Sequence, residues 1–215
     1  MTNPIRILHV RVDGVFGGVE RLILDYFRLL NRQKFISILA PMVNRALLAQ
    51  GAAALGIAVE FVPMRSRFDS SASRRLEEII RERKIDLVMA YGIRADLTVS
   101  QATQRTGTPW ISNVQNLIYN DYSNPVQGRI FYYLDRWILR KADAVTLCAR
   151  YIKPPLSKGL FKLHNLVHVP NGISFSDPDP KSDSDRLRES IGLSENAQVI
   201  LCAGRLEHVK GQRLL

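Results

Sequence analysis

Long hydrophobic runs are absent from this sequence. A membrane-spanning helix needs about 20 consecutive apolar residues, and the most apolar helix-like segment, residues 130–139, is interrupted by Asp135 and Arg136. Residues 1–6 also lack the basic and then apolar arrangement of a secretory signal peptide. We therefore expect a cytoplasmic protein that associates at most peripherally with the inner face of a membrane.

Cysteine and histidine are scarce as well. Cys148 and Cys202 make no metal-binding spacing, and each ends an apolar run, so we expect both to be buried thiols. The four histidines are too scattered to form a ligand set: His9, His164, His168 and His208. His9 lies in an apolar stretch, which predicts a buried, hydrogen-bonded side chain. We expect no metal and no resident cofactor.

Acidic residues are outnumbered, with 20 Asp and Glu against 30 Lys and Arg and a formal charge of +10. A basic surface attracts nucleic acid, anionic lipid or phosphorylated substrates. The cations are spread in short groups with no recognised nucleic-acid motif, so we expect no nucleic-acid partner. The charge nevertheless leaves one alternative to an enzyme open, a non-catalytic basic module that binds an anionic membrane or nucleic acid.

Short apolar runs alternate with amphipathic segments along most of the chain. The apolar runs predict strands over residues 5–10, 35–40, 57–62, 86–90, 110–114, 142–147 and 166–169. Helical spacing predicts helices over residues 19–30, 46–55, 70–84, 95–105 and 125–141. Such alternation predicts an α/β fold with a doubly wound, Rossmann-like parallel sheet. Ligands of such sheets bind beyond the carboxyl ends of the strands.

The predicted helix over residues 125–141 is the longest. Its apolar residues recur at helical spacing and are expected to face inward: Ile130, Phe131, Leu134, Trp137 and Ile138.

A domain boundary is predicted at the turn signal Pro170–Asn171–Gly172. Residues 1–171 form the first domain. Residues 172–196 form a linker and a short helix, because residues 176–185 are rich in Ser, Asp and Pro. Residues 197–215 then begin a second Rossmann-like domain, with a strand over residues 198–203.

The loop after the first strand, residues 13–20, is rich in glycine. Glycines between a strand and a helix let the backbone approach a phosphate, and the helix N-terminus favours negative charge. The spacing of Gly14, Gly17 and Gly18 is neither the dinucleotide fingerprint nor a Walker A loop. A tight strand-to-helix turn is the structural alternative.

The loop after the predicted strand 198–203 holds two cations, Arg205 and Lys210. An arginine fork and a compact ammonium five residues apart are suited to one diphosphate. Preorganised positive charge of this kind stabilises a departing nucleoside diphosphate. Two solvated basic residues in a surface loop are the alternative.

Four stretches in this order resemble one family: residues 17–20, 142–145, 169–173 and 204–211. The sequence is similar to the retaining GT-B glycosyltransferases of family 4, and the resemblance spans residues 5–215. It implies an amino-terminal acceptor-binding domain followed by the beginning of a donor-binding domain. The implied activity is transfer of a sugar from a nucleotide-sugar donor to a glycan or lipid-linked acceptor.

The resemblance also implies roles for individual residues. Four would contact the donor phosphates: Gly17, Gly18, Arg205 and Lys210. Glu20 would hold the loop and the start of the helix, and Asn171 and Gly172 would belong to the interdomain hinge. The acceptor and sugar side of the cleft would comprise Glu20, Tyr91, Gly92, Arg94, Gln115 and Asn116. No catalytic residue is identified.

Two departures from the family pattern matter. Gln115 stands where many relatives carry a histidine, and its amide can hydrogen-bond a sugar but cannot perform acid–base chemistry. A plain loop residue is the alternative for Gln115. The pair of glutamates that holds the donor in relatives does not occur, so we expect these 215 residues alone to have little or no activity. Arg94 either binds an anionic acceptor, pairs with Asp96 or starts the helix. A sugar-nucleotide epimerase of the same fold is a weaker alternative.

Overall fold

The computed structural model describes residues 3–12, 16–43, 47–66, 69–118, 124–172, 188–194, 197–204 and 211–214. The chain divides into two compact units, Met1–Asn171 and Gly172–Leu215. The division falls at the turn Pro170–Asn171–Gly172. The linker expected over residues 176–185 lies outside the described residues.

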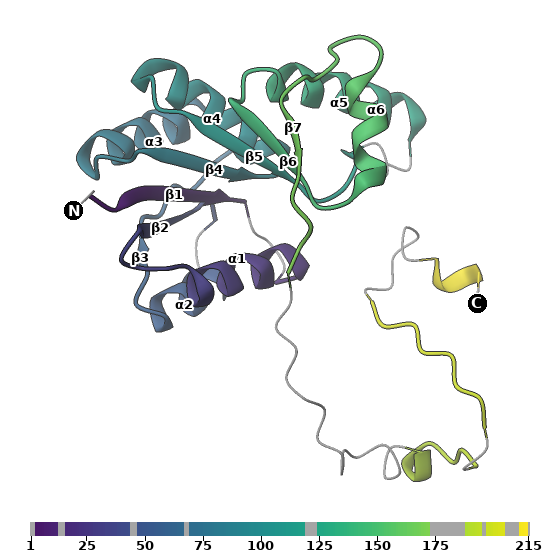
Figure 1. The fold of residues 1–215 in the computed structure, drawn as a ribbon. Coiled ribbons are helices and arrows are strands. Elements are labelled where there is room, and N and C mark those ends of the chain that lie inside the picture. Colours follow the sequence, from purple (N-terminus) through teal and green to yellow (C-terminus); the bar gives the residue numbers. More distant parts are fainter. Residues whose placement is uncertain are drawn as a thin grey trace. The chain divides into compact units, whose positions relative to one another are not determined.

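The first unit is built on a seven-stranded, all-parallel sheet with the order β3-β2-β1-β4-β5-β6-β7 (Figure 1). The strands are β1 Ile5–Arg11, β2 Phe35–Pro41, β3 Ala58–Val59, β4 Leu87–Tyr91, β5 Trp110–Val114, β6 Ala144–Leu147 and β7 Leu166–His168. The predicted doubly wound parallel sheet is confirmed. β3 is shorter than expected, because the regular pairing of this edge strand with β2 covers two residues.

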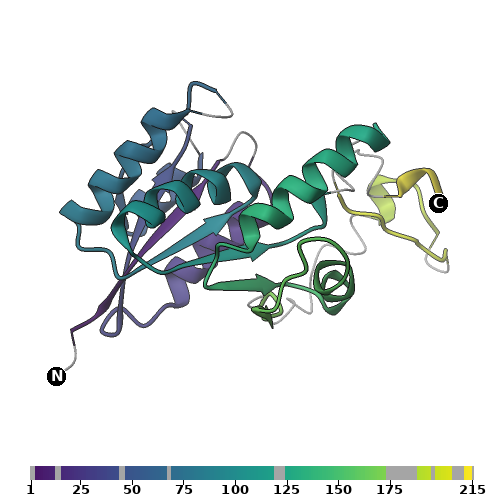
Figure 2. The ribbon, with the colours of Figure 1, turned by 90° about the horizontal axis from the view of Figure 1, so that it is seen from above.

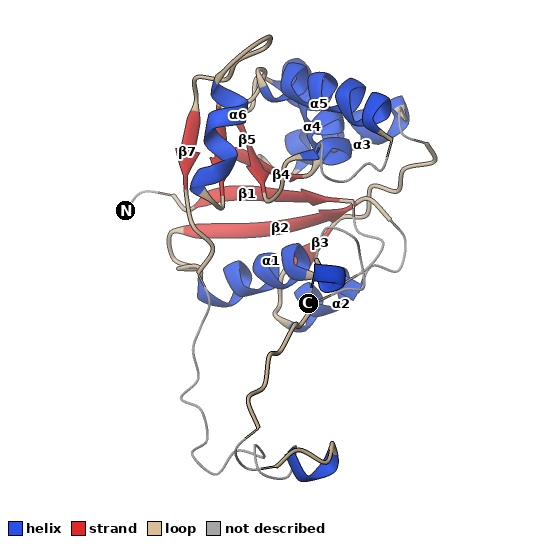
Figure 3. Ribbon diagram, turned by 90° about the vertical axis from the view of Figure 1, so that its right-hand side faces the viewer, coloured by secondary structure: helices blue, strands red, loops and turns tan. Residues whose placement is uncertain are grey.

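Helices cover both faces of the sheet. They are α1 Gly18–Leu29, α2 Leu47–Ala54, α3 Ser70–Glu82, α4 Ile93–Thr106, α5 Pro125–Leu139 and α6 Lys153–Ser157, the last preceded by the 3-10 helix η2 Arg150–Ile152. α1 and α2 lie on one face, and α3, α4 and α5 lie on the other (Figure 3). Figure 2 shows α3, α4 and α5 in a row. Neither η2 nor α6 was predicted from the residue pattern.

Capping residues explain where several helices begin and end. The Asp69 side chain accepts a hydrogen bond from the Ser71 amide (2.9 Å) at the start of α3. Asn124 accepts one from the Val126 amide (2.9 Å) at the start of α5. α4 ends at Gly107, which adopts the left-handed conformation (φ +72°) that a residue without a Cβ accommodates best.

The core has two parts, one on each face of the sheet. One includes Leu8 and Val10 of β1 together with Leu76 of α3. The other lies under α1 and α2 and includes Ile23, Phe27, Leu39, Leu48 and Tyr91. His9 is buried, and its ring nitrogens lie 3.0 Å from the Tyr91 hydroxyl and 3.4 Å from the Ser37 hydroxyl. The expectation of a buried, hydrogen-bonded histidine is confirmed.

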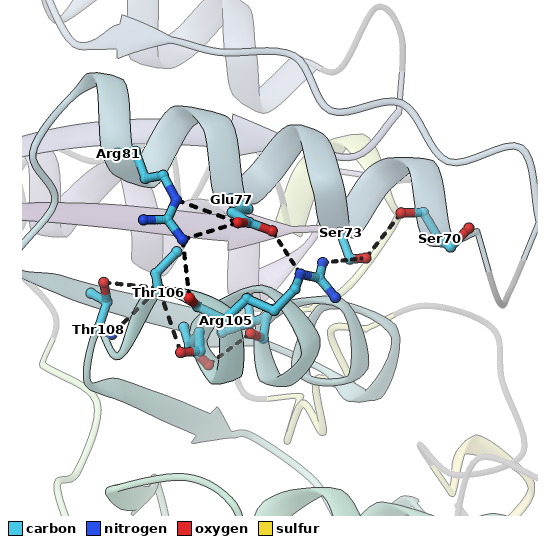
Figure 4. Close-up of polar contacts among 9 residues, drawn as sticks. Ser70, Ser73, Glu77, Arg81, Arg105, Thr106 and Thr108 are labelled. Atoms are coloured by element: carbon cyan, nitrogen blue, oxygen red, sulfur yellow. Dashed lines mark hydrogen bonds and ion pairs between the residues drawn. The ribbon is translucent and has the colours of Figure 1, made fainter.

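A polar cluster joins α3 to α4 at the surface (Figure 4). Glu77 accepts hydrogen bonds from the Arg105 Nε (2.6 Å) and the Arg81 Nη2 (3.1 Å). These two guanidinium groups lower the pKa of the Glu77 carboxyl, with Arg105 the larger cause. Arg105 also donates to the Ser73 hydroxyl at 3.0 Å, so both helices are fixed in register.

The predicted inward face of α5 is wrong for two residues. Ile130 is 60% exposed and Trp137 is 44% exposed. The residues of α5 that are buried are Gly128, Arg136, Ile138 and Leu139. Arg136 turns inward because its guanidinium donates to the backbone carbonyls of Pro155 and Lys158, and this rotates Ile130 and Trp137 outward.

In the second unit, the expected strand over residues 198–203 is not formed. Residues 197–204 have no regular secondary structure, and Ile200 and Leu201 are 83% and 85% exposed. A strand requires a hydrogen-bonded neighbour, and none lies alongside within the described residues of this unit. Cys202 is exposed and Cys148 half-buried, so the expectation of two buried thiols is wrong.

Candidate functional site

The strand order reverses between β1 and β4. From β1 the chain first runs outward to β2 and β3, and then returns to β4 on the other side of β1. In open parallel sheets, ligands bind beyond the carboxyl ends of the strands at such a reversal. Arg11 and Tyr91 are direct neighbours in the register of β1 and β4, and each ends its strand there. The loops that follow these two residues are therefore the candidate site.

Arg11 is the residue that joins the two loops. Its Nε donates to the Glu20 Oε1 at 2.8 Å, and its Nη1 donates to the Tyr91 carbonyl oxygen at 3.0 Å. The Arg11 side chain is 22% exposed and the Glu20 side chain 2%. Sequence reasoning missed Arg11. The available signal was a charged residue at the carboxyl end of the first strand.

Glu20 fixes the start of α1. Its second carboxylate oxygen, Oε2, accepts a hydrogen bond from the Gly17 amide at 2.9 Å, which is the contact expected of a residue that holds the loop. Gly18 begins α1, and nothing lies within 4 Å of the position where a Cβ would stand on it. A helix N-terminus with open backbone favours an anion through its amide groups and its dipole.

The loop after β4 approaches Arg11 closely. Gly92 has φ +93°, and a Cβ placed on it would lie 3.2 Å from the Arg11 Nη1. Tyr91 lies 1% exposed, with its ring stacked beside that of His9 (centroids 6.1 Å apart). The Tyr91 side chain belongs to the core and does not line the loop, so its contribution at this edge is the carbonyl oxygen that accepts from Arg11.

The side chains of Arg94 and Asp96 differ in their exposure to solvent. Arg94 is exposed at the second position of α4, whereas Asp96 is 2% exposed. Among the ion pairs of the described residues, none joins the two, and the Asp96 Oδ1 has no hydrogen-bond partner. Burial raises the pKa of the Asp96 carboxyl well above its usual value, and nearby Asp135 raises it further. Arg94 therefore starts the helix without pairing with Asp96.

Gln115 and Asn171 are brought together across 56 residues of sequence. The Asn171 Nδ2 donates to the Gln115 Oε1 at 2.7 Å, and the Gln115 Nε2 also lies within hydrogen-bond distance of the Asn113 Oδ1. The amide of Gln115 is thus engaged by protein groups. Asn116 is exposed, and its Oδ1 accepts from the Leu117 amide at 2.9 Å.

Two expected donor-phosphate residues, Arg205 and Lys210, lie outside the described residues, as does Gly14 of the glycine-rich loop. Within the described part of the chain, no three His, Cys, Asp or Glu side chains group closely enough to hold a metal ion. In the same part, no helix is both long and apolar enough to cross a membrane. Among the placed residues, Arg11 is paired with Glu20, and Gly18 stands uncovered at the start of α1, where the helix dipole suits an anionic ligand.

The structure resembles several solved glycosyltransferases. A glycosyltransferase from Rickettsia africae ESF-5 matches with a TM-score of 0.71 and 19% identity over 96% of this chain and 54% of its own. Anabaena Alr3699/HepE in complex with UDP and glucose matches with a TM-score of 0.64 and 16% identity over 87% of this chain and 50% of its own. HepE in complex with UDP-glucose matches at 0.63 and 14%, with the same coverage.

At these identities, the likeness establishes the fold. The sheet and its flanking helices are those of GT-B glycosyltransferases, and the chain spans about half the length of these matched structures. No curated protein matches the chain. The family described as "Glycosyl transferase 4-like domain" matches residues 17–172, which begin at the glycine-rich loop and end at the turn between the two units. The chain therefore belongs to the glycosyl transferase 4-like family.

Proposed function

We propose that this chain is the acceptor-binding part of a retaining glycosyltransferase, which transfers a sugar from a nucleoside-diphosphate donor to a glycan or lipid-linked acceptor. One observation carries the proposal. In a chain of this family, the helix start at Gly17–Gly18 lies at the strand reversal, and Glu20 joins it to Arg11 by hydrogen bonds to the Gly17 amide and the Arg11 Nε. A helix start with an uncovered glycine, Gly18, favours a phosphate at that position.

The donor would be bound through its diphosphate. We propose that the backbone at Gly17 and Gly18, together with Arg205 and Lys210, contacts the phosphate oxygens. Charge on the departing diphosphate is the largest charge that develops in sugar transfer, and fixed cations stabilise it without a metal ion. HepE is described with UDP and with UDP-glucose, so uridine nucleotides are the first donors to test.

The acceptor would meet the loops after β4 and β5. Arg94 is exposed at the start of α4 and offers a cation to an anionic acceptor, such as a lipid phosphate. Gln115 would contact the sugar only after its amide leaves Asn171, because the two are hydrogen-bonded. We further propose a cytoplasmic location with peripheral attachment to a membrane.

The test is sugar transfer with defined stereochemistry. Two samples are incubated with radiolabelled UDP-glucose and a membrane lipid extract: the protein expressed from the full reading frame that encodes these residues, and the 215-residue chain alone. We expect the protein from the full reading frame to form a labelled product with the anomeric configuration of the donor. We expect the 215-residue chain to form little or no product. If the full reading frame neither binds nor consumes any of a panel of nucleotide sugars, the proposal fails. An inverted product would contradict the retaining mechanism alone.

A further inference from the structure

The outward face of α5 carries a row of apolar side chains. Its members are Val126, Ile130, Tyr133 and Trp137, with exposed fractions of 66%, 60%, 40% and 44%. Their spacing of four, three and four residues keeps them within an arc of about 60° and along about 16 Å of the helix axis. We refer to these four residues as the α5 row.

Cations flank the α5 row. By the same helical geometry Arg129 lies on one side of it, and Arg140 and Lys141 directly follow the last residue of α5. The Lys141 Nζ lies 3.9 Å from the centre of the Trp137 ring, and the Arg140 guanidinium lies 5.8 Å from the centre of the Phe161 ring. These contacts hold positive charge beside the exposed Trp137 ring and the half-buried Phe161 ring.

Acidic residues are few in this part of the chain. Residues 124–172 contain eight Lys or Arg and two Asp, within a chain whose formal charge is +10. One of the two, Asp135, is half-buried, and its helical position is opposite the α5 row. The exposed face of α5 is therefore both apolar and basic.

The packing of α5 keeps this face exposed. Arg136 is 1% exposed, and its Nη1 donates to the Tyr132 hydroxyl and the Pro155 carbonyl oxygen, each at 2.5 Å. Tyr132 donates to the same carbonyl at 3.0 Å. These bonds tie α5 to the neighbouring α6 (Figure 1), so a rotation that buried the α5 row would break them.

We propose that the α5 row and its flanking cations dock on an anionic lipid bilayer. Aliphatic side chains would enter the boundary between headgroups and acyl chains, Trp137 and Tyr133 would lie at headgroup level, and the cations would meet lipid phosphates. The aliphatic part of the row favours lipid over nucleic acid, which would be bound by the cations and rings alone. This inference specifies the peripheral location proposed above and does not depend on the transferase chemistry.

The experiment is co-sedimentation of the 215-residue chain with sucrose-loaded vesicles. Vesicles contain either phosphatidylglycerol with phosphatidylcholine or phosphatidylcholine alone. We expect binding to the anionic vesicles, weakened by salt. Two variants should each lower the partition coefficient by at least about tenfold. The apolar variant combines Ile130→Ser with Trp137→Ser, and the charge variant combines Arg129→Gln, Arg140→Gln and Lys141→Gln.

Matched controls use exposed residues elsewhere on the first unit. Arg21→Gln with Lys34→Gln and Arg74→Gln removes the same charge, and Leu29→Ser removes an exposed apolar side chain. Both should retain vesicle binding within about twofold, and far-ultraviolet circular dichroism verifies that all variants fold. Failure to bind anionic vesicles, or equal losses in the controls, would overturn the proposal.

Two other partners of this face, a second copy of the chain and nucleic acid, are distinguished by separate measurements. A dimer in sedimentation velocity that Ile130→Ser with Trp137→Ser dissociates would assign the face to a second copy of the chain. Duplex DNA binding that the α5 charge variant abolishes, without vesicle binding, would assign it to nucleic acid. Either result overturns the lipid assignment. Donor binding is measured in the absence of vesicles. If no nucleotide sugar binds, the transferase proposal is refuted, and the assignment of this face to lipid is unaffected.

Discussion

The Arg11 Nε donates to the Glu20 Oε1 at 2.8 Å, and this ion pair joins the end of β1 to the first turn of α1. Arg11 extends the link to β4 through the Tyr91 carbonyl, and Glu20 extends it to Gly17. The proposed donor loop therefore takes its conformation from a nearly buried charge pair.

Breaking this pair should destabilise the first unit. Arg11→Met leaves the Glu20 carboxylate buried without its cation, and we expect the free energy of unfolding to fall by about 2–3 kcal/mol. Adding Glu20→Gln should recover part of the loss, because the uncompensated charge is then gone. Urea unfolding followed by circular dichroism measures both. Arg28→Met, which removes an exposed pair with Asp25, is the control and should cost less than about 0.5 kcal/mol. Equal losses for Arg11→Met and Arg28→Met would contradict this reading.

Gly92 and Gly18 should respond differently to alanine. Gly92→Ala places a Cβ at φ +93° and 3.2 Å from the Arg11 Nη1, and we expect a loss of about 2–3 kcal/mol. Gly18→Ala meets open space, so the fold should keep its stability. Gly18→Ala should nevertheless weaken binding of UDP, since a methyl group would stand where phosphate approaches the backbone. Thermal unfolding and a UDP titration distinguish the two effects, and unchanged UDP affinity in Gly18→Ala would argue against a donor at this loop.

Asp96 should make the protein less stable at higher pH. Its folded pKa is raised by burial and by Asp135. The contribution of Asp96 to the free energy of unfolding is therefore fully present below the pKa that Asp96 has in the unfolded chain. Between that pKa and the higher folded pKa, the contribution falls by about 1.4 kcal/mol per pH unit. Asp96→Asn removes this dependence, so the variant should be more stable than the parent at pH 8, with the difference shrinking toward pH 4. Urea midpoints at both pH values test this. A difference that did not change with pH would rule it out.

His9 should have the opposite effect on the acid side. Burial lowers the pKa of His9 from 6.5 to about 3. Below pH 6.5 the unfolded chain binds a proton that the folded protein excludes, so stability is lost as pH falls, by about 1.4 kcal/mol per unit. His9→Gln keeps a polar group near Tyr91 and cannot titrate. Its stability should decline less than that of the parent between pH 7 and pH 4.5. Parallel declines in the two proteins would show that the pKa of His9 is the same in the folded and the unfolded chain, which would contradict this prediction.

The sheet could be predicted from local pattern because each strand and helix is specified by its own periodicity. The strand over Trp110–Val114 has the predicted bounds, and α1 begins one residue before the predicted start. The strand expected over residues 198–203, by contrast, is not formed. Its apolar run is typical of a strand, yet strand formation depends on a hydrogen-bonded neighbour, which a local pattern does not supply.

Parts of the candidate site could not be predicted because they depend on contacts between distant segments. Glu20 and Gly17 are three residues apart, so their contact is accessible to sequence reasoning. The bond between Arg11 and Tyr91 spans 80 residues, and the amide pair of Gln115 with Asn171 spans 56. The outward turn of Trp137 likewise follows from carbonyl groups near α6, which the periodicity of α5 does not include.

Amide-resolved nuclear magnetic resonance of the 15N-labelled 215-residue chain measures the proposed binding of a nucleoside diphosphate at the start of α1. Titration with UDP to millimolar concentration should shift the Gly17, Gly18 and Val19 amide signals in a saturable way. Uridine, which lacks phosphate, should leave these signals in place, and Arg205→Ala with Lys210→Ala should weaken the UDP response by about tenfold. Amide signals at Gly17 and Gly18 that do not move with UDP, or that move equally with uridine, would contradict the account.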